Sequence, residues 1–240
     1  MAADLEKLAR KFQKDYPEFA ASLHASAQVA RKLGAPEHFP AETSSAKTPE
    51  THVEIKTFSK EALEFLKTRK ELVYTLNGQS LKDQQLAGRP FWFIFSGGEE
   101  FLTFPSMRSE VAFNPSPEKF FLPESKNLTL PQQEEMIAEY SHKLQKEFGS
   151  DTIRAVMGDA PDYTSIAFQH LDATKAKGKA EYLFGKEYGG YDYARTKTPT
   201  SGSHVAHVGN FNADFGLCVD HLSPDDGHGY VRAAPLVVPA

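Results

Sequence analysis

The sequence contains almost no cysteine or tryptophan and no long hydrophobic run. Its 240 residues include one cysteine, Cys218, and one tryptophan, Trp92. A single thiol excludes an intrachain disulfide framework and any zinc site built from several thiolates. No apolar stretch approaches the roughly 18 residues that span a bilayer, and the first residues lack the basic-then-apolar layout of a signal peptide. We therefore expect no membrane span, and a location in the cytoplasm or export without a recognisable N-terminal signal.

The sequence also lacks an excess of basic residues. Its formal net charge is −5, whereas a general nucleic-acid binder needs a basic surface to displace counterions. Apolar residues make up 40% and charged residues 25% of the chain, which is enough for a sizeable core and argues against global disorder. Composition thus indicates a soluble, globular protein that does not bind nucleic acid, and it says nothing about chemistry.

The chain divides by composition near residue 50. Residues 3–33 are charged and alanine-rich with helical spacing, and residues 36–51 have the Pro, Ser and Thr content of a linker. We therefore expect an N-terminal helical segment and linker in 1–50 and one domain in 51–240. The N-terminal helices are assigned to assembly or attachment, with formation of a homo-oligomer as one option.

Residues 51–240 alternate between strand and helix patterns. Capping residues Ser59, Thr129 and Asp159 predict helix starts, the last two for the two main helices. Strands are expected at 53–57, 72–76, 89–95, 101–104, 110–113, 153–157 and 236–238, with 89–95 and 101–104 forming a hairpin. The segment from Gly185 to residue 231 is expected to be rich in loops. These patterns predict an α+β domain.

Residues 203–231, called the restricted segment below, use an unusual subset of residue types. These 29 residues contain no Lys, Arg, Glu, Gln, Met, Trp, Ile or Thr, although a quarter of the chain is charged. Their only formal charges are Asp214, Asp220, Asp225 and Asp226, and they hold four of the nine histidines, His204, His207, His221 and His228. Long loops without structure of their own are usually functional when ordered, so this segment is the main functional candidate.

Three interpretations of the restricted segment compete. It is an ordinary surface loop of chance composition, or a metal site, or a binding surface made of diversified positions. For a metal, Cys218-x-x-His221, His204-x-x-His207 and Asp225-Asp-Gly-His228 offer thiolate, imidazole and carboxylate ligands. Such short pairs arise readily by chance, so their spacing is not specific.

The third interpretation rests on codon chemistry and on contact chemistry. The residue types present can arise from changes at the two adenines of an asparagine AAC codon, whereas Lys, Glu, Gln, Met and Trp cannot. Tyr and Phe supply rigid contact area, and Ser, Asn, Asp and His supply adaptable polar contacts, as in antibody paratopes.

The end of the chain resembles a known family. Val208-Gly-Asn-Phe-Asn-Ala-Asp214, Val219-Asp-His-Leu-Ser-Pro-Asp-Asp226 and Arg232-Ala-Ala-Pro-Leu-Val-Val238 are similar to the C-terminal variable region of diversity-generating retroelement target proteins. The resemblance covers about the last 50 residues. It implies a C-type-lectin-like fold, related to that of formylglycine-generating enzymes, with mixed short strands, two helices and a loop-rich variable region at about 203–231. Those enzymes use a pair of cysteines, and this chain has only Cys218, which disfavours that activity.

We therefore expect a non-enzymatic ligand-binding protein with no cofactor and no metal, whose C-terminal surface binds a macromolecule, expected to be a protein. Phe211, Phe215 and Tyr230 would be anchors, and the Asp, Asn and His would set polar specificity. The expected contact residues are Asn210, Phe211, Asn212, Phe215, Leu217, Cys218, Asp220, His221, Leu222, Ser223, Asp225, Asp226, His228 and Tyr230.

Two alternatives stay open at this stage. The first is a metal-dependent hydrolase that uses His204, His207, Cys218, His221 or Asp225. The second is a structural scaffold protein that acts through its N-terminal helices. Outside the restricted segment, His170 on an apolar helix side is expected to be a hydrogen-bonded core histidine. Tyr193 either flanks the binding face or packs a loop.

Overall fold

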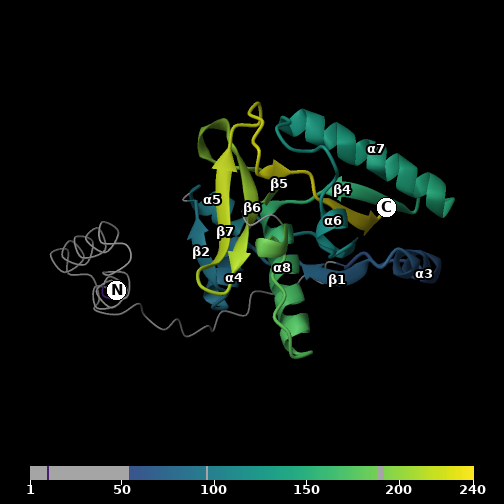
Figure 1. Cartoon of the computed structure of the whole chain (residues 1–240), viewed down its shortest axis with the longest axis horizontal. Helices are drawn as coiled ribbons and strands as arrows, with labels where there is room; N and C mark the ends of the chain where they lie inside the picture. The colour runs from purple at the N-terminus through teal and green to yellow at the C-terminus, as the bar shows by residue number, and fades with distance from the viewer. Residues whose placement is uncertain (1–9, 11–53, 96, 189–191) are drawn as a thin grey trace. The chain divides into compact units, whose positions relative to one another are not determined.

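A computed structural model describes Arg10 and residues 54–95, 97–188 and 192–240 (Figure 1). Apart from Arg10, the helices expected at 3–33 and the linker at 36–51 lie outside these residues. Contacts divide the chain after His52, and every element named below belongs to the unit Val53–Ala240. Within the described residues, no helix is both long and apolar enough to cross a membrane.

The described unit is α+β, with its strands arranged in two sheets. Its helices are α3 (Lys60–Thr68), α4 (Leu81–Leu86), α5 (Glu99–Thr103), α6 (Pro117–Phe120), α7 (Leu130–Phe148) and α8 (Ala160–Lys175), with short 3₁₀ turns at Lys186–Tyr188 and Ser201–Ser203. Its strands are β1 (Leu72–Asn77), β2 (Phe91–Ile94), β3 (Arg108–Phe113), β4 (Ile153–Met157), β5 (Tyr193–Pro199), β6 (Val205–Asn212), β7 (Gly216–Leu222), β8 (Val231–Arg232) and β9 (Pro235–Pro239).

The first sheet has the order β1-β3-β9-β4, and its neighbouring strands are antiparallel. Alternation along these strands feeds two different cores, because successive side chains point to opposite faces. Leu236 and Val238 of β9 join one apolar cluster, whereas Val237 joins the other, which also contains Leu66 of α3 and Ile137 of α7. At β9, the first sheet is therefore buried on both faces.

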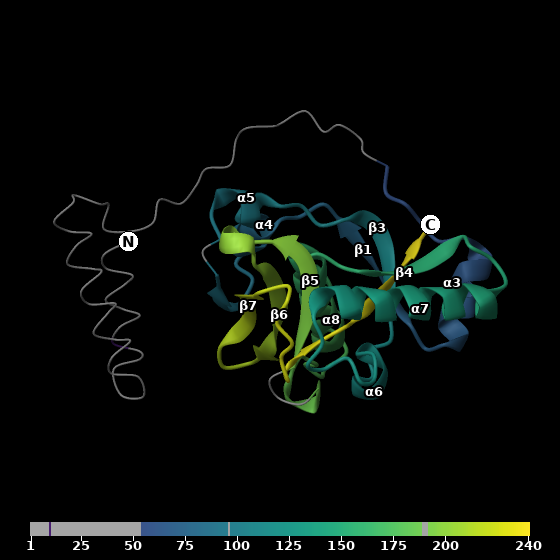
Figure 2. The same ribbon diagram turned by 90° about the horizontal axis from the view of Figure 1, so that it is seen from above.

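The second sheet has the order β2-β7-β6-β5-β8. Strands β6 and β7 form an antiparallel hairpin, and β2 and β8 pair in parallel with β7 and β5. Ala206 and Val208 of β6, together with Val219 of β7, enter the larger apolar cluster on one face. In Figure 2 these strands are seen beside α8, which contacts both β5 and β6.

Helices α7 and α8 begin where their capping residues predict. Thr129 and Gln132 form a capping box at the start of α7, and Gly149 ends it in the left-handed conformation with φ 78°. The Asp159 N–H donates to Asp162 Oδ2 at 2.7 Å at the start of α8. Helix α7 packs on β4, and α8 contacts β1 and β6 (Figure 1). The side chains of α8 are buried from Ala160 to Phe168, which makes it a central core helix.

The prediction of a hairpin between 89–95 and 101–104 is wrong. Residues 101–103 belong to helix α5, where Phe101 is buried, and β2 pairs in parallel with β7 from the C-terminal part of the chain. Both runs, 89–95 and 101–104, are short and aromatic, and such runs do not specify their strand partner. Pairing with the distant strand β7 therefore determined where residues 91–94 lie. No strand forms over the described residues of 53–57, where Lys56 makes only an isolated bridge to Ser109.

The expectation of a loop-rich stretch up to residue 231 is also wrong for much of its length. Strands β5, β6 and β7 occupy it, and the turn from Asn212 to Gly216 is short. Glycine, histidine and asparagine have low strand propensity, but neighbours on both sides supply the hydrogen bonds that hold β6 and β7 in the sheet. The strands expected at 72–76, 110–113, 153–157 and 236–238 are confirmed as β1, β3, β4 and β9.

Candidate ligand-binding site

A pocket of about 450 Å³ lies on the second sheet. We call it the His–Tyr pocket. It is lined by Tyr193, His207, Asp220, His221, Leu222, His228, Tyr230 and Val231. These residues come from β5, β6, β7 and the connection between β7 and β8. All of them except Tyr193 belong to the restricted segment.

The hairpin register explains how side chains of β6 and β7 reach the pocket. His207 lies opposite Asp220, and Val208 lies opposite Val219. Since strand side chains alternate between faces, Val208 and Val219 enter the core, while His207 and Asp220 face away from it and line the pocket. The restricted segment thus supplies both a core face and a pocket face.

Two glycines allow close approach of neighbouring strands. A Cβ at Gly209 would lie 2.5 Å from the Asp192 carbonyl oxygen, next to Tyr193. Gly216 has φ +100°, and a Cβ there would lie 2.3 Å from the Pro90 carbonyl oxygen. Only glycine fits these two positions without a backbone shift, so they fix β5 and β2 against the hairpin.

The buried guanidinium of Arg195 holds the connection that forms one side of the pocket. Arg195 is fully buried. It donates to the carbonyl oxygens of Asp226 at 2.7 Å and Leu128 at 3.2 Å, and to Gln133 Oε1 at 2.9 Å. Its planar fork suits several acceptors at once. The Leu130 N–H also donates to the Pro224 carbonyl oxygen at 2.8 Å, so the start of α7 anchors this connection.

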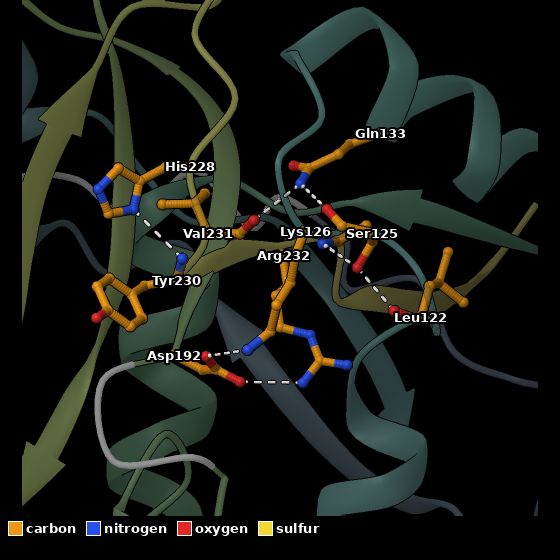
Figure 3. A network of polar contacts seen from close by, with 10 residues as sticks. Leu122, Ser125, Lys126, Gln133, Asp192, His228, Tyr230, Val231 and Arg232 are labelled. Atoms are coloured by element: carbon orange, nitrogen blue, oxygen red, sulfur yellow. Dashed lines mark hydrogen bonds and ion pairs between the residues drawn. The ribbon is translucent and has the colours of Figure 1, made fainter.

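A second polar network fixes the ends of β5 and β8 (Figure 3). The Asp192 carboxylate, 3% exposed, pairs with Lys126 Nζ at 3.1 Å and Arg232 Nη1 at 3.0 Å. The Gln133 amide donates to the Val231 carbonyl oxygen at 3.0 Å. Because Tyr193 and Val231 adjoin these residues in sequence, the network sets the positions of two pocket-lining side chains. Figure 3 also shows His228 and Tyr230 on the adjoining stretch of chain.

His207 is the most deeply buried histidine of the pocket. Its side chain packs edge-on to the Tyr193 ring at 4.8 Å, and Nδ1 is buried without a hydrogen-bond partner. Burial lowers the pKa of His207 to about 4, with Arg195 also disfavouring the charged form and Asp220 opposing the shift. His207 is therefore neutral at pH 7, with one ring nitrogen donating and the other accepting.

His221 lies at the strand end beside an aromatic neighbour. Its ring is 3.6 Å from that of Phe95, and His204 packs edge-on to it at 4.9 Å. The His221 N–H donates to Asp220 Oδ1 at 2.8 Å, which orients that carboxylate. On the opposite side of the pocket, the rings of His228 and Tyr230 are 5.3 Å apart.

The structure places the fourteen predicted contact residues in four locations. Asp220, His221, Leu222, His228 and Tyr230 line the pocket. Asn210, Asn212 and Phe215 lie at the hairpin end, where Asn212 Oδ1 accepts from the N–H of Phe215 at 2.9 Å. Ser223, Asp225 and Asp226 lie on the β7–β8 connection. Phe211, Leu217 and Cys218 are buried.

The buried trio corrects part of the prediction. Phe211 and Leu217 are fully buried in the larger core cluster, so neither is a surface anchor or contact. Cys218 is 3% exposed, and burial raises the pKa of its thiol to about 11, which keeps it protonated. A segment taken as a loop gave no basis for placing these side chains. Leu217 faces the core because strand side chains alternate and Val219 faces it too, whereas Phe211 follows a register shift between Gly209 and Asn212. Cys218, paired with Gly209, lies on the pocket face of β7 and is covered there.

The list of expected contact residues also omitted part of the pocket. Tyr193, His207 and Val231 line it. His207 could have been found from the alternation of Val205, His207 and Gly209 with Ala206 and Val208, which is a strand signal. Tyr193 carries no such signal, because its place depends on the pairing of β5 with β6. Outside the pocket, Trp92 is 53% exposed on the edge strand β2, and its ring lies 5.6 Å from the Phe215 ring.

The metal-ligand pairs of the sequence do not converge. Among the described residues, no group of three or more His, Cys, Asp or Glu side chains is placed to hold a metal ion. A spacing of three residues puts Cys218 and His221 on opposite faces of β7. His170, by contrast, is a hydrogen-bonded core residue, with Nδ1 3.2 Å from the Tyr74 hydroxyl and Nε2 3.6 Å from Glu181.

Comparisons of this chain with protein-family models, with curated proteins and with solved structures give no match.

Proposed function

We propose that this chain is a non-enzymatic ligand-binding protein whose restricted segment forms a hypervariable contact surface diversified by a retroelement. The C-type-lectin-like classification of the α+β domain is part of the same proposal. The observation that carries it is the overlap of two independent features. Residues selected by composition alone, 203–231, supply every lining residue of the pocket except Tyr193.

The different roles of core-facing and outward residues in the β6–β7 hairpin support this proposal. A surface that tolerates replacement needs a backbone fixed by something other than the replaced side chains. Here β6 and β7 are interior strands flanked by β5 and β2, their inward residues fill the core, and Arg195 binds backbone carbonyls of the β7–β8 connection. Backbone contacts of this kind do not depend on the identity of the displayed side chains.

The gene provides the direct test. A near-copy of the coding segment for 203–231, differing mainly at adenines, should lie close to a reverse transcriptase gene. We further expect the differences to fall in codons for outward residues such as Asp220 and His228, and to spare inward residues such as Val208. A complete locus without the near-copy would contradict diversification. Differences spread equally over inward and outward codons would contradict the display role.

The non-enzymatic assignment has its own test. Elemental analysis of protein purified without chelator should find no stoichiometric zinc, and the protein should be stably folded without it. Stoichiometric zinc that is lost in the variant His221→Ala would favour the metal-dependent hydrolase instead. The scaffold alternative is tested by deleting residues 1–50 and measuring oligomeric state and ligand binding separately. Loss of both would favour action through the N-terminal segment.

A further inference from the structure

The pocket has an uneven charge distribution. Its lining contains one carboxylate, Asp220, and no lysine or arginine. Asp225 and Asp226 are exposed on the adjoining connection. Two arginines that adjoin pocket residues are occupied elsewhere. Arg195 is fully buried against backbone carbonyls, and Arg232 pairs with Asp192. A ligand entering this pocket therefore meets a negative field that a cationic group complements.

The polar atoms at the base of the pocket include two acceptors. Asp220 Oδ1 accepts from His221, and no described residue donates to Oδ2. His207 is 8% exposed, it is neutral at pH 7, and its Nδ1 has no partner. A buried polar atom without a partner is costly and in native proteins calls for a missing group. With the proton on Nε2, His207 Nδ1 accepts a hydrogen bond. Guanidinium and ammonium groups carry only donors, so they match both acceptors.

Aromatic side chains form the sides of the pocket. The Tyr193 ring is held at 4.8 Å from His207 with an interplanar angle of 85°, and Tyr230 is 51% exposed at the rim next to His228. Cations bind favourably over tyrosine faces, and arginine does so more often than lysine. The volume of about 450 Å³ suits one long side chain rather than a whole folded element.

We propose that the His–Tyr pocket receives an arginine side chain presented by a protein partner. This proposal rests on the proposed ligand-binding function. It adds the chemical class of ligand that the side chains of this sequence would bind. Asp220 and His207 accept hydrogen bonds from the guanidinium, and Tyr193 and Tyr230 flank its plane. Trp92 and Phe215, 5.6 Å apart and both exposed, lie near the start of β7, whereas the pocket residue His221 lies near its end. They supply apolar contact area for the rest of the partner.

The experiment uses the full chain and small probes of known charge. N-acetyl-arginine methylamide is titrated at millimolar concentration against ¹⁵N- and ¹³C-labelled protein, and the imidazole and tyrosine ring signals are followed by NMR. The matched control probe is the citrulline derivative, which has nearly the same shape without the charge. We expect the arginine probe to shift the signals of His207 and Tyr193 and to bind at least roughly tenfold more tightly than the citrulline probe.

Paired variants separate the pocket from general electrostatics. Asp220→Asn removes the lining carboxylate and should weaken arginine binding roughly tenfold. Asp214→Asn makes the same chemical change on the exposed hairpin turn of the restricted segment, outside the pocket, and should leave the affinity within about twofold. Circular dichroism of both variants checks that Asp220→Asn loses binding while the domain stays folded.

Several outcomes would overturn the proposal. Equal binding of the arginine and citrulline probes would remove the role of charge. Tighter binding of N-acetyl-glutamate methylamide or of glucose would assign the pocket to another ligand class. No shift with any probe, or equal losses in Asp220→Asn and Asp214→Asn, would also contradict it. The proposed function fails on the gene test instead, so a failed titration beside an intact near-copy and reverse transcriptase rejects only the arginine assignment.

Discussion

Side chains alternate between the two faces of the strands in both sheets, but the faces have different surroundings. In the first sheet, neighbouring residues of β9 enter two separate cores, and every residue of Pro235–Pro239 is buried. In the second sheet, one face of β6 and β7 fills a core, and the other carries His207 and Asp220 into a pocket. At β9 the first sheet thus has no face left for a ligand, whereas the second sheet keeps one at β6 and β7.

This difference separates positions that stability constrains from positions that recognition can use. A residue with core on its side of a strand is fixed by packing, since interiors are close-packed. A residue on the pocket face is in contact with solvent, so its replacement changes the free energy of unfolding less. The comparison can be tested by matched substitutions in the two sheets.

The largest expected effect is at the centre of the first sheet. Leu236 of β9 is fully buried, so Leu236→Ala should lower the free energy of unfolding by about 3 kcal/mol, because it removes apolar contacts and leaves a cavity. Leu222→Ala makes the same change on the half-buried pocket face and should cost about 1 kcal/mol. Urea unfolding measures both, and equal costs would contradict the distinction between the sheets.

The next largest effect is expected at Arg195, which links α7 to the β7–β8 connection. Arg195→Met removes a buried guanidinium and leaves Gln133 Oε1 and the Asp226 carbonyl oxygen without a donor. We expect a loss of about 2–3 kcal/mol and faster amide exchange in 223–230. The control Arg89→Met removes a half-exposed ion pair with Asp172 and should cost less than about 1 kcal/mol. Unchanged exchange in 223–230 for Arg195→Met would show that the connection is held by other contacts.

A pH effect should distinguish the pocket face from the first sheet. Burial lowers the pKa of His207 from 6.5 to about 4, so the unfolded chain takes up a proton first as the pH falls. Stability from this residue is therefore complete above pH 6.5 and is lost as the pH drops towards 4, amounting to roughly 3 kcal/mol. His207→Leu should flatten this part of the curve of unfolding free energy against pH. The same slope in wild type and variant would reject the assignment to His207.

The smallest effects are expected on the exposed connection. Asp225 and His228 are exposed, and Asp225→Ala and His228→Ala should each change the unfolding free energy by no more than about 0.5 kcal/mol. Val219→Ala, from the core face of the adjoining strand β7, serves as the contrasting control and should cost about 2 kcal/mol. Thermal unfolding followed by circular dichroism is sufficient. Losses of similar size at all three positions would mean that the connection is part of the core.

Capping residues and apolar runs correctly predicted the helices and strands whose boundaries depend on residues within or next to the element. The capping residues of α3, α7 and α8 located these helices, because a cap bonds within one turn. Apolar runs located β1, β3, β4 and β9 for a similar reason. The hairpin predicted at 89–104 was wrong, since the partner of β2 lies more than a hundred residues away in β7.

The sequence predicted which segment forms the site, but it did not predict which side chains of that segment are exposed. Composition selected residues 203–231, which supply most of the pocket. It did not separate Phe211 and Leu217, which pack in the core, from Asp220 and His228, because that separation follows from strand register. Tyr193 entered the pocket through the pairing of β5 with β6, a contact that no local pattern records.

The position of β9 has a consequence for how faulty copies of this protein would be handled. Strand β9 lies between β3 and β4, and it follows the restricted segment in the chain. A frameshift or premature stop anywhere in 203–231 removes the centre of the first sheet along with the pocket. Such a chain exposes apolar surface and becomes a substrate for proteases instead of displaying a defective pocket. The order of the elements thus couples an intact reading frame through the restricted segment to the survival of the whole domain.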